Sequence, residues 1–202
     1  NSISSSKKAG GITKKQLRKL KKQVKTAVKK PQVGNKYAVV EVFCLPRFVP
    51  EVEKLGLRGL SLDIKNGWNL DDPKTQAWVL QEMKDHPPEL MVLCPPCTDA
   101  GGWFHINSLR MPAHEVLKRR VRLKKQREFC KKLIQQQIDS GGRFMFEHPS
   151  PSCTWDDPQF VKWCEMFYAF NTHMCCFNLH VPATQSHPKQ LIKKNTKLLC
   201  IP

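Results

Sequence analysis

The chain has 202 residues, 40% of them hydrophobic, and its 34 Lys and Arg against 17 Asp and Glu give a net charge of +17. This length supports one well-packed core plus an appendage, and no apolar run is long enough to span a membrane. So large an excess of positive charge predicts a polyanionic partner. We expect that partner to be nucleic acid, DNA or RNA, and not a membrane.

Nine cysteines occur at irregular spacing, several of them inside apolar runs. This pattern favours free thiols in a reducing compartment over a disulfide framework. We therefore expect an intracellular protein, with a nuclear location as the first choice for a chain of this charge.

Residues 1–35 differ in composition from the rest and are predicted to form a separate basic extension. Residues 1–30 hold eleven Lys or Arg and no acidic residue. After a flexible Ser/Gly-rich lead, the stripe Leu17, Leu20, Val24 and Val28 predicts a helix that Pro31 ends. This extension is interpreted either as a contact to phosphates or as a solvated tail that serves as a localisation signal.

From residue 36 to residue 202, strand-like and helix-like segments alternate. Strands are predicted at 37–43, 59–64, 90–93 and 144–146, with late candidates at 174–177 and 198–201. Helices are predicted through Val49 and Leu55, after the Asp72-Pro73 start signal, over 113–140 and after Asp157-Pro158. This alternation predicts an α/β domain with a Rossmann-like, doubly wound, mostly parallel sheet and crossover helices.

Two of the apolar runs stop at proline with a reactive side chain beside the break. The run 89–98 ends in Cys94-Pro-Pro-Cys97, and the run 143–149 ends in Glu147-His148-Pro149. Carboxyl ends of parallel strands meet at one edge of a sheet, where a thiol and a carboxylate can act as nucleophile and acid/base group. His148 is interpreted either as part of this site or as a packed residue at a strand end.

The order of these motifs resembles the cytosine-C5 DNA methyltransferase superfamily. The matching residues are Glu41-Val-Phe43, Asp63, Pro96-Cys97 and the segment from Phe144 through Glu147 to Trp155. The likeness extends from about residue 37 to the end of the chain. It is closest to a divergent branch in retroelement-type polyproteins, which implies other domains of a larger polyprotein as partners.

The resemblance implies S-adenosylmethionine as cofactor and a role for each matching residue. Cys97 corresponds to the thiolate that adds to C6 of cytosine, and Glu147 to the residue that holds the base edge. Glu41 and Phe43 belong to the cofactor-binding first strand, and Asp63 corresponds to the ribose ligand. The target base must be flipped out or single-stranded. Trp68 is a candidate to close over the adenine, although a packing role is the simpler interpretation.

Two hypotheses of different class remain open: a methyltransferase that uses Cys97 and Glu147, and a degenerate, non-catalytic nucleic-acid-binding domain. The first loop, residues 44–48, reads Cys-Leu-Pro-Arg-Phe and lacks the glycines of the family, which favours the second hypothesis. Asp99 would also oppose a thiolate at Cys97 unless a cation offsets it.

Cysteine chemistry offers two further alternatives. Cys94 and Cys97 have the spacing of a redox pair. Zinc could be bound by ligands drawn from Cys94, Cys97, His173, Cys175 and Cys176.

The helix predicted at 113–140 carries more cations than a solvated helix face needs, which predicts contacts to phosphates. The flexible aromatic loop expected at 101–105 would cover the site and contact a nucleotide. The candidate nucleic-acid-binding residues are Arg119, Arg120, Arg122, Lys124, Lys125, Trp103, Lys193 and Lys194.

Overall fold

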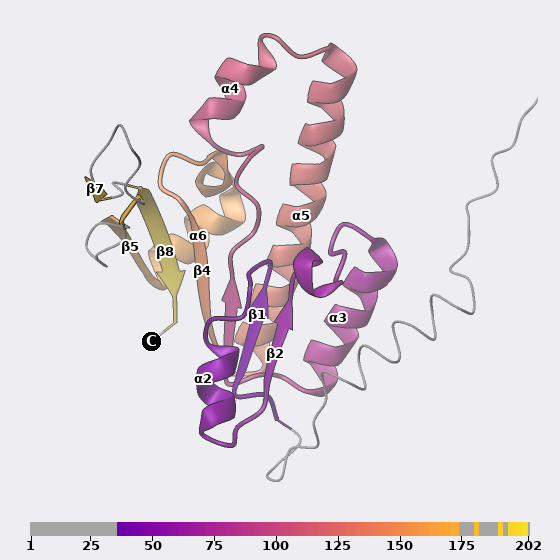
Figure 1. Ribbon diagram of the computed structural model, residues 1–202, viewed down its shortest axis with the longest axis vertical. Helices are drawn as coiled ribbons and strands as arrows, with labels where there is room; N and C mark the ends of the chain where they lie inside the picture. The colour runs from indigo at the N-terminus through magenta and orange to yellow at the C-terminus, as the bar shows by residue number, and fades with distance from the viewer. Residues whose placement is uncertain (1–35, 174–179, 182–189, 192–193, 202) are drawn as a thin grey trace, which may run out of the picture. The chain divides into compact units, whose positions relative to one another are not determined.

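The computed structural model describes residues 36–173, 180–181, 190–191 and 194–201 (Figure 1). The predicted basic helix of residues 1–35 and the candidate strand at 174–177 lie outside these residues. The helices are α2 (Val49–Lys54), η1 (Ile64–Asn66), α3 (Pro73–Asp85), α4 (Gly102–Ser108), α5 (Ala113–Asp139), η2 (Cys153–Asp156) and α6 (Pro158–Met166). The strands are β1 (Val39–Val42), β2 (Gly59–Leu62), β3 (Leu90–Leu93), β4 (Arg143–Pro149), β5 (Tyr168–His173), β6 (His180–Val181), β7 (Gln190–Leu191) and β8 (Asn195–Cys200).

Six of these strands form one mixed sheet in the order β2-β1-β3-β4-β8-β5. The first four are parallel, and β8 pairs antiparallel with both β4 and β5. The prediction of an α/β domain with a mostly parallel sheet is therefore confirmed. The antiparallel insertion of β8 was not predicted.

The two faces of the sheet are covered by different helices. On one face, Val39 of β1 and Val92 of β3 pack against Val49 of α2. On the other face, Phe146 of β4 packs on Phe160 of α6 with ring centroids 4.7 Å apart, and α5 lies along β4. The buried residues of β4 alternate with half-buried ones, as expected for a strand with two unlike faces.

N-terminal capping residues determine where the helices that connect successive strands begin. The side chain of Asp72 accepts a hydrogen bond from the Lys74 amide at the start of α3, with Pro73 in the first turn. Asp157 caps α6 through the Gln159 amide in the same way. Both helix starts were predicted from the sequence and are confirmed.

Two segments differ from the prediction. Residues 102–108 form α4 and not the flexible loop that was predicted. Gly101 is extended, and the backbone is helical from Gly102 onward. Strand β5 was not predicted, because Tyr168 and Phe170 are exposed and its sequence lacks a buried apolar run. The long helix α5, in contrast, agrees with the predicted 113–140 to within one residue.

Candidate functional site at the carboxyl edge of the sheet

The parallel strands bring their carboxyl ends to one edge of the sheet. Val42 of β1 is level with Leu62 of β2 and with Leu93 of β3, which in turn is level with Phe146 of β4. The chain therefore reaches Phe43, Asp63, Cys94 and Glu147 at neighbouring points of this edge. The strand order also reverses at β1, and such a point is where open α/β sheets bind ligands.

The loop after β1 is organised by a buried carboxylate. Glu41 is 1% exposed, and its two oxygens accept hydrogen bonds of 3.0 Å from the amides of Arg47 and Val49. Phe43 adopts a positive φ of 61°, a conformation that a non-glycine residue enters at a cost of about 1–2 kcal/mol. Glu41 thus shapes the turn from within, and Phe43 supplies the left-handed residue that the loop otherwise lacks.

The residues proposed for S-adenosylmethionine meet only part of what that cofactor needs. Asp63 lies at the end of β2, where one carboxylate oxygen accepts the Lys65 amide at 2.8 Å. Trp68 is 8% exposed and stacks on Trp78 with centroids 4.8 Å apart, so it is a packing residue. Because Glu41 is also satisfied by amides of the chain, the residues at this edge do not complete a cradle for the cofactor.

The loop that carries Cys97 is tied to the neighbouring strand. The carbonyl of Cys97 accepts hydrogen bonds from the amides of Ala100 and Gly101, both at 3.1 Å. The Cys153 amide after β4 donates to the Ala100 carbonyl at 3.1 Å. Cys97 is half-buried and carries a free thiol. These bonds tie the loop that carries Cys97 to the segment that follows β4.

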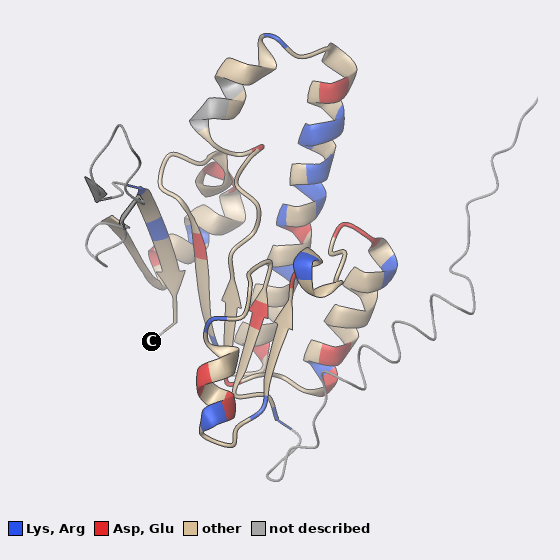
Figure 2. Ribbon diagram, viewed as in Figure 1, with Lys and Arg blue, Asp and Glu red and all other residues tan. Residues whose placement is uncertain are grey.

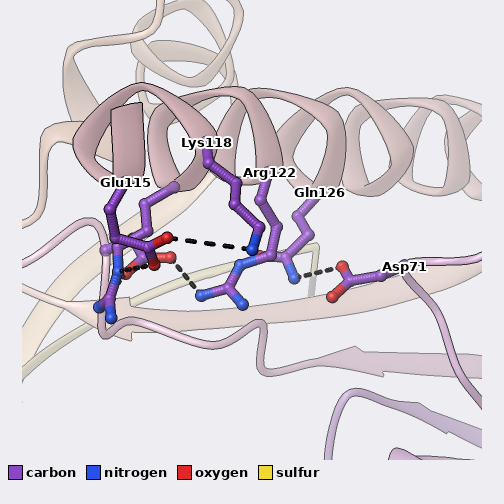
Figure 3. Close-up of polar contacts among 7 residues, drawn as sticks. Asp71, Glu115, Lys118, Arg122 and Gln126 are labelled. Atoms are coloured by element: carbon purple, nitrogen blue, oxygen red, sulfur yellow. Dashed lines mark hydrogen bonds and ion pairs between the residues drawn. The ribbon is translucent and has the colours of Figure 1, made fainter. Parts of the chain in front are cut away.

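Helix α5 supplies the cations that offset Asp99. The Asp99 side chain is 5% exposed and forms ion pairs with Arg119 and Arg122, whose side chains are 29% and 48% exposed. Arg119 also binds Glu115 at 3.0 Å. Figure 3 shows Arg122 and Gln126 reaching from one side of α5 toward the neighbouring loops, where Gln126 donates to Asp71 at 2.6 Å. We call the set Asp99, Arg119 and Arg122 the Asp99 clamp.

Glu147 is a carboxylate with unused bonding capacity. Its side chain is 19% exposed, and Oε1 is buried without a hydrogen bond among the described residues. Its ion-pair partner is the ammonium of Lys194, 3.6 Å from Oε1. A carboxylate oxygen held in this way can accept a hydrogen bond from an incoming donor, such as an exocyclic amine.

His148 points to the opposite face and is 1% exposed. Burial, reinforced by the charge of Lys194, lowers the pKa of His148 to about 4. A hydrogen bond to the backbone of Pro96 opposes this shift. Because Pro96 has no amide hydrogen and Nδ1 has no described partner, Nε2 donates to the Pro96 carbonyl. His148 is therefore a neutral residue that anchors the Cys97 loop, which agrees with the packing interpretation.

The thiols of Cys44 and Cys94 form a second feature of this edge. A hydrogen bond to Cys94, together with burial, raises the pKa of Cys44, so that this thiol stays protonated. Both residues pack against the valine cluster under α2. Cys94 therefore lies beside Cys44 in this cluster, and the thiol of Cys44 also donates to the Val42 carbonyl at 3.7 Å.

The zinc hypothesis depends on residues at two places in the fold. Cys94 and Cys97 follow β3, and His173 ends β5, whereas Cys175 and Cys176 lie outside the described residues. Within the described part of the chain, no three His, Cys, Asp or Glu side chains are grouped as metal ligands.

The basic helix separates its cations into two groups. Arg119 and Arg122 belong to the Asp99 clamp, whereas Arg120, Lys124 and Lys125 are exposed and make no ion pair with a described residue. Figure 2 shows Lys and Arg following one another along the part of α5 nearest α4. The side chain of Trp103 in α4 and all of Lys193 lie outside what the structure describes. Sequence reasoning could not divide these arginines, because their partner Asp99 is distant in the chain.

Comparison of the chain with models of protein families, with curated proteins and with solved structures gave no match. Among the helices that the structure describes, none is both long enough and apolar enough to cross a membrane.

Proposed function

We propose that this chain is a nucleic-acid-binding domain with a Rossmann-like, methyltransferase-type fold. The observation that carries the proposal is the exposed face of α5, where Arg120, Lys124 and Lys125 form no ion pair with a described residue. At about 1.5 Å per residue, the 27 residues of α5 span roughly 40 Å, far more than the four residues of β3. The cations therefore extend past the sheet edge that holds Cys97 and Glu147.

Cations gathered on one helix repel each other, and a polyanion removes this cost. Lys118, Arg120, Lys124 and Lys125 lie within eight residues, with Glu115 and Glu128 as the nearest carboxylates of the helix. Each phosphate neutralised by such a side chain releases condensed counterions, which favours binding at low salt. Side chains of this kind bind phosphate without reading sequence, so the proposal covers both DNA and RNA.

Replacement of Arg120, Lys124 and Lys125 by Glu tests this proposal. We expect roughly tenfold or greater loss of affinity for a labelled oligonucleotide in fluorescence anisotropy, and a plot of log K against log salt that is shallower by about three. Replacement of the exposed Lys65, Lys74 and Lys84 by Glu is the matched control, because it changes the net charge equally. Equal losses in the two triple variants would reduce the effect to net charge and contradict the proposal.

The strand order supports the fold assignment within the proposal. The sheet is mostly parallel, with β8 inserted antiparallel between β4 and β5, and this arrangement is compatible with a Rossmann-like fold. A fold alone does not carry an activity. The sheet therefore supports the Rossmann-like part of the proposal and leaves the chemistry to the residues of the site.

A second candidate function is covalent chemistry on cytosine by Cys97. It is favoured by the positions of Cys97 just after β3 and of Glu147 near the end of the adjacent β4, by the absence of a described hydrogen bond to Oε1 of Glu147, and by the two arginines that neutralise Asp99. The test is incubation with an oligonucleotide containing 5-fluorocytosine in the presence of S-adenosylmethionine. A denaturant-stable adduct that is absent in Cys97→Ala and present in Cys153→Ala would support catalysis. Oligonucleotide binding without an adduct would assign the chain to the non-catalytic class.

A further inference from the structure

A groove lies between α4 and the first turns of α5, and the function proposed above does not account for it. Its volume is about 420 Å³, within the range of small-ligand sites. Most of its lining side chains are apolar, with one cation among them. The lining residues are Ser108, Met111, Ala113, Val116, Leu117 and Arg120.

The surroundings of the groove are unusually apolar for a helix that faces water. Leu109 is 86% exposed, Leu117 64%, Ile106 56% and Val121 45%. Leu117 and Val121 are four residues apart and share one face of α5. All of the buried side chains of α5 lie from Gln126 onward, so the sheet does not account for these aliphatic residues.

The unpaired cations occupy the same outward face. At 100° per residue, Arg120 and Lys124 flank Leu117 and Val121, and Lys125 lies on the far side of Val121. Arg120 also lines the groove itself. The surface thus combines a row of positive charges with a bordering hollow whose lining mixes aliphatic side chains with Ser108 and Arg120.

The exposed cations and the neighbouring aliphatic residues together favour some ligands of the α4–α5 groove over others. A second copy of the chain would bring the same cations against each other, which opposes association. A nucleic-acid duplex presents phosphates but keeps its bases stacked, so it leaves the aliphatic residues unused. A single strand presents both phosphates and unstacked base faces, and guanidinium groups also stack on bases.

We infer that the protein binds single-stranded nucleic acid, with one unstacked base in the α4–α5 groove and the flanking phosphates on Arg120, Lys124 and Lys125. This inference rests on the proposed nucleic-acid-binding function and names the form of the substrate. It also agrees with the position of α4, which begins five residues after Cys97. Strand held in the groove would reach the sheet edge without a duplex having to be opened.

The experiment compares three fluorescein-labelled ligands of equal length at one salt concentration: an oligothymidylate, its duplex with oligoadenylate, and a strand of abasic sites. We expect the oligothymidylate to bind the full chain roughly three to ten times more tightly than the abasic strand. Leu117→Ala should lower that ratio toward one and leave the affinity for the abasic strand unchanged. Arg120→Glu should weaken the binding of both single strands.

Leu55→Ala is the matched control, because this leucine is 75% exposed at the end of α2. Equal affinities for all three ligands, or a wild-type ratio in Leu117→Ala, would overturn the inference while leaving the proposed function intact. No binding of any ligand by the folded chain would refute the proposed function itself. Displacement of the oligothymidylate by a helical Leu/Glu peptide at lower concentration than by unlabelled strand would assign the groove to a protein partner and overturn the inference.

Discussion

The imidazole of His148 is neutral in the folded protein at neutral pH, since its pKa is lowered to about 4. In the unfolded chain the same group titrates near 6.5. Between these values the unfolded state binds a proton that the folded state does not, so acid favours unfolding. This contribution to stability is present above pH 6.5 and is lost as the pH falls through 4, by roughly 3 kcal/mol in total.

His148→Gln should remove this part of the pH dependence, because glutamine keeps an amide donor for Pro96 but does not titrate. We expect the free energy of unfolding, measured by urea denaturation from pH 7 to pH 4, to fall less steeply in the variant than in the wild type. His86→Gln is the control, because His86 is only half-buried at the end of α3. Parallel curves for wild type and His148→Gln would show that His148 is not the group responsible.

For single residues, the sequence predicts which residue types gather at the site better than it predicts what those residues do. The sequence placed Cys97 and Glu147 where two apolar runs stop, and the structure has Cys97 four residues after β3 and Glu147 two residues before the end of β4. Glu41 and Trp68 were expected to bind cofactor, whereas Glu41 holds two loop amides and Trp68 stacks on Trp78. A sequence pattern gives the position of a polar group but not which neighbour satisfies it.

At the scale of elements, the Asp99 clamp fastens α5 to the loop between β3 and α4. Removing either arginine leaves the other to neutralise Asp99, whereas removing both leaves a carboxylate that is 95% buried without a partner. We expect Arg119→Met and Arg122→Met each to cost less than about 1 kcal/mol of unfolding free energy. The double variant should cost about 2–3 kcal/mol, more than the sum of the two.

Addition of Asp99→Asn to the double variant should recover most of the loss, since an amide needs no cation. Chemical denaturation of the wild type and the four variants at neutral pH measures these differences. Strictly additive losses, or no recovery with Asp99→Asn, would mean that the arginines stabilise the helix by other contacts, such as that between Arg119 and Glu115.

The predicted elements succeeded where a local signal decides the structure. The Asp-Pro starts of α3 and α6, the strand 90–93 and the whole of α5 were read correctly from caps, apolar runs and a terminal Gly-Gly. Helix α4 was mistaken for a loop, because two glycines and three aromatic or histidine residues carry little intrinsic helix preference. Strand β5 exists through its pairing with β8, a distant partner that no local pattern reveals.

At the scale of the whole molecule, the sheet depends on β8. Strand β5 joins the sheet through β8 alone, and Leu199 of β8 is fully buried between β4 and β5. Leu199→Ala should cost about 2–5 kcal/mol. Hydrogen exchange read by mass spectrometry should show loss of protection in β5 before β1. Leu45→Ala, at a leucine that is 42% exposed, is the control, and equal loss in β1 and β5 would contradict this hierarchy.

The order of all six strands could not be predicted from the sequence, because it depends on pairing between strands that are distant in the chain. Alternation of strands and helices predicts parallel neighbours, and it did so for β1 to β4. The insertion of β8 between β4 and β5 depends on the fit of buried side chains such as Leu199 and Thr196 in three dimensions. The long-range part of the fold is thus decided by packing, while its parallel part is already apparent in the sequence.

The place of β8 also has a consequence for biosynthesis. A ribosome releases β4 well before β8, with 45 residues between Pro149 and Asn195. During that interval the edge of β4 that later pairs with β8 exposes unpaired amides and carbonyls, and such an edge recruits other chains. Pairing with β8 covers this edge once β8 has left the ribosome. The nascent chain therefore has a period of vulnerability to aggregation, and its length is set by translation speed.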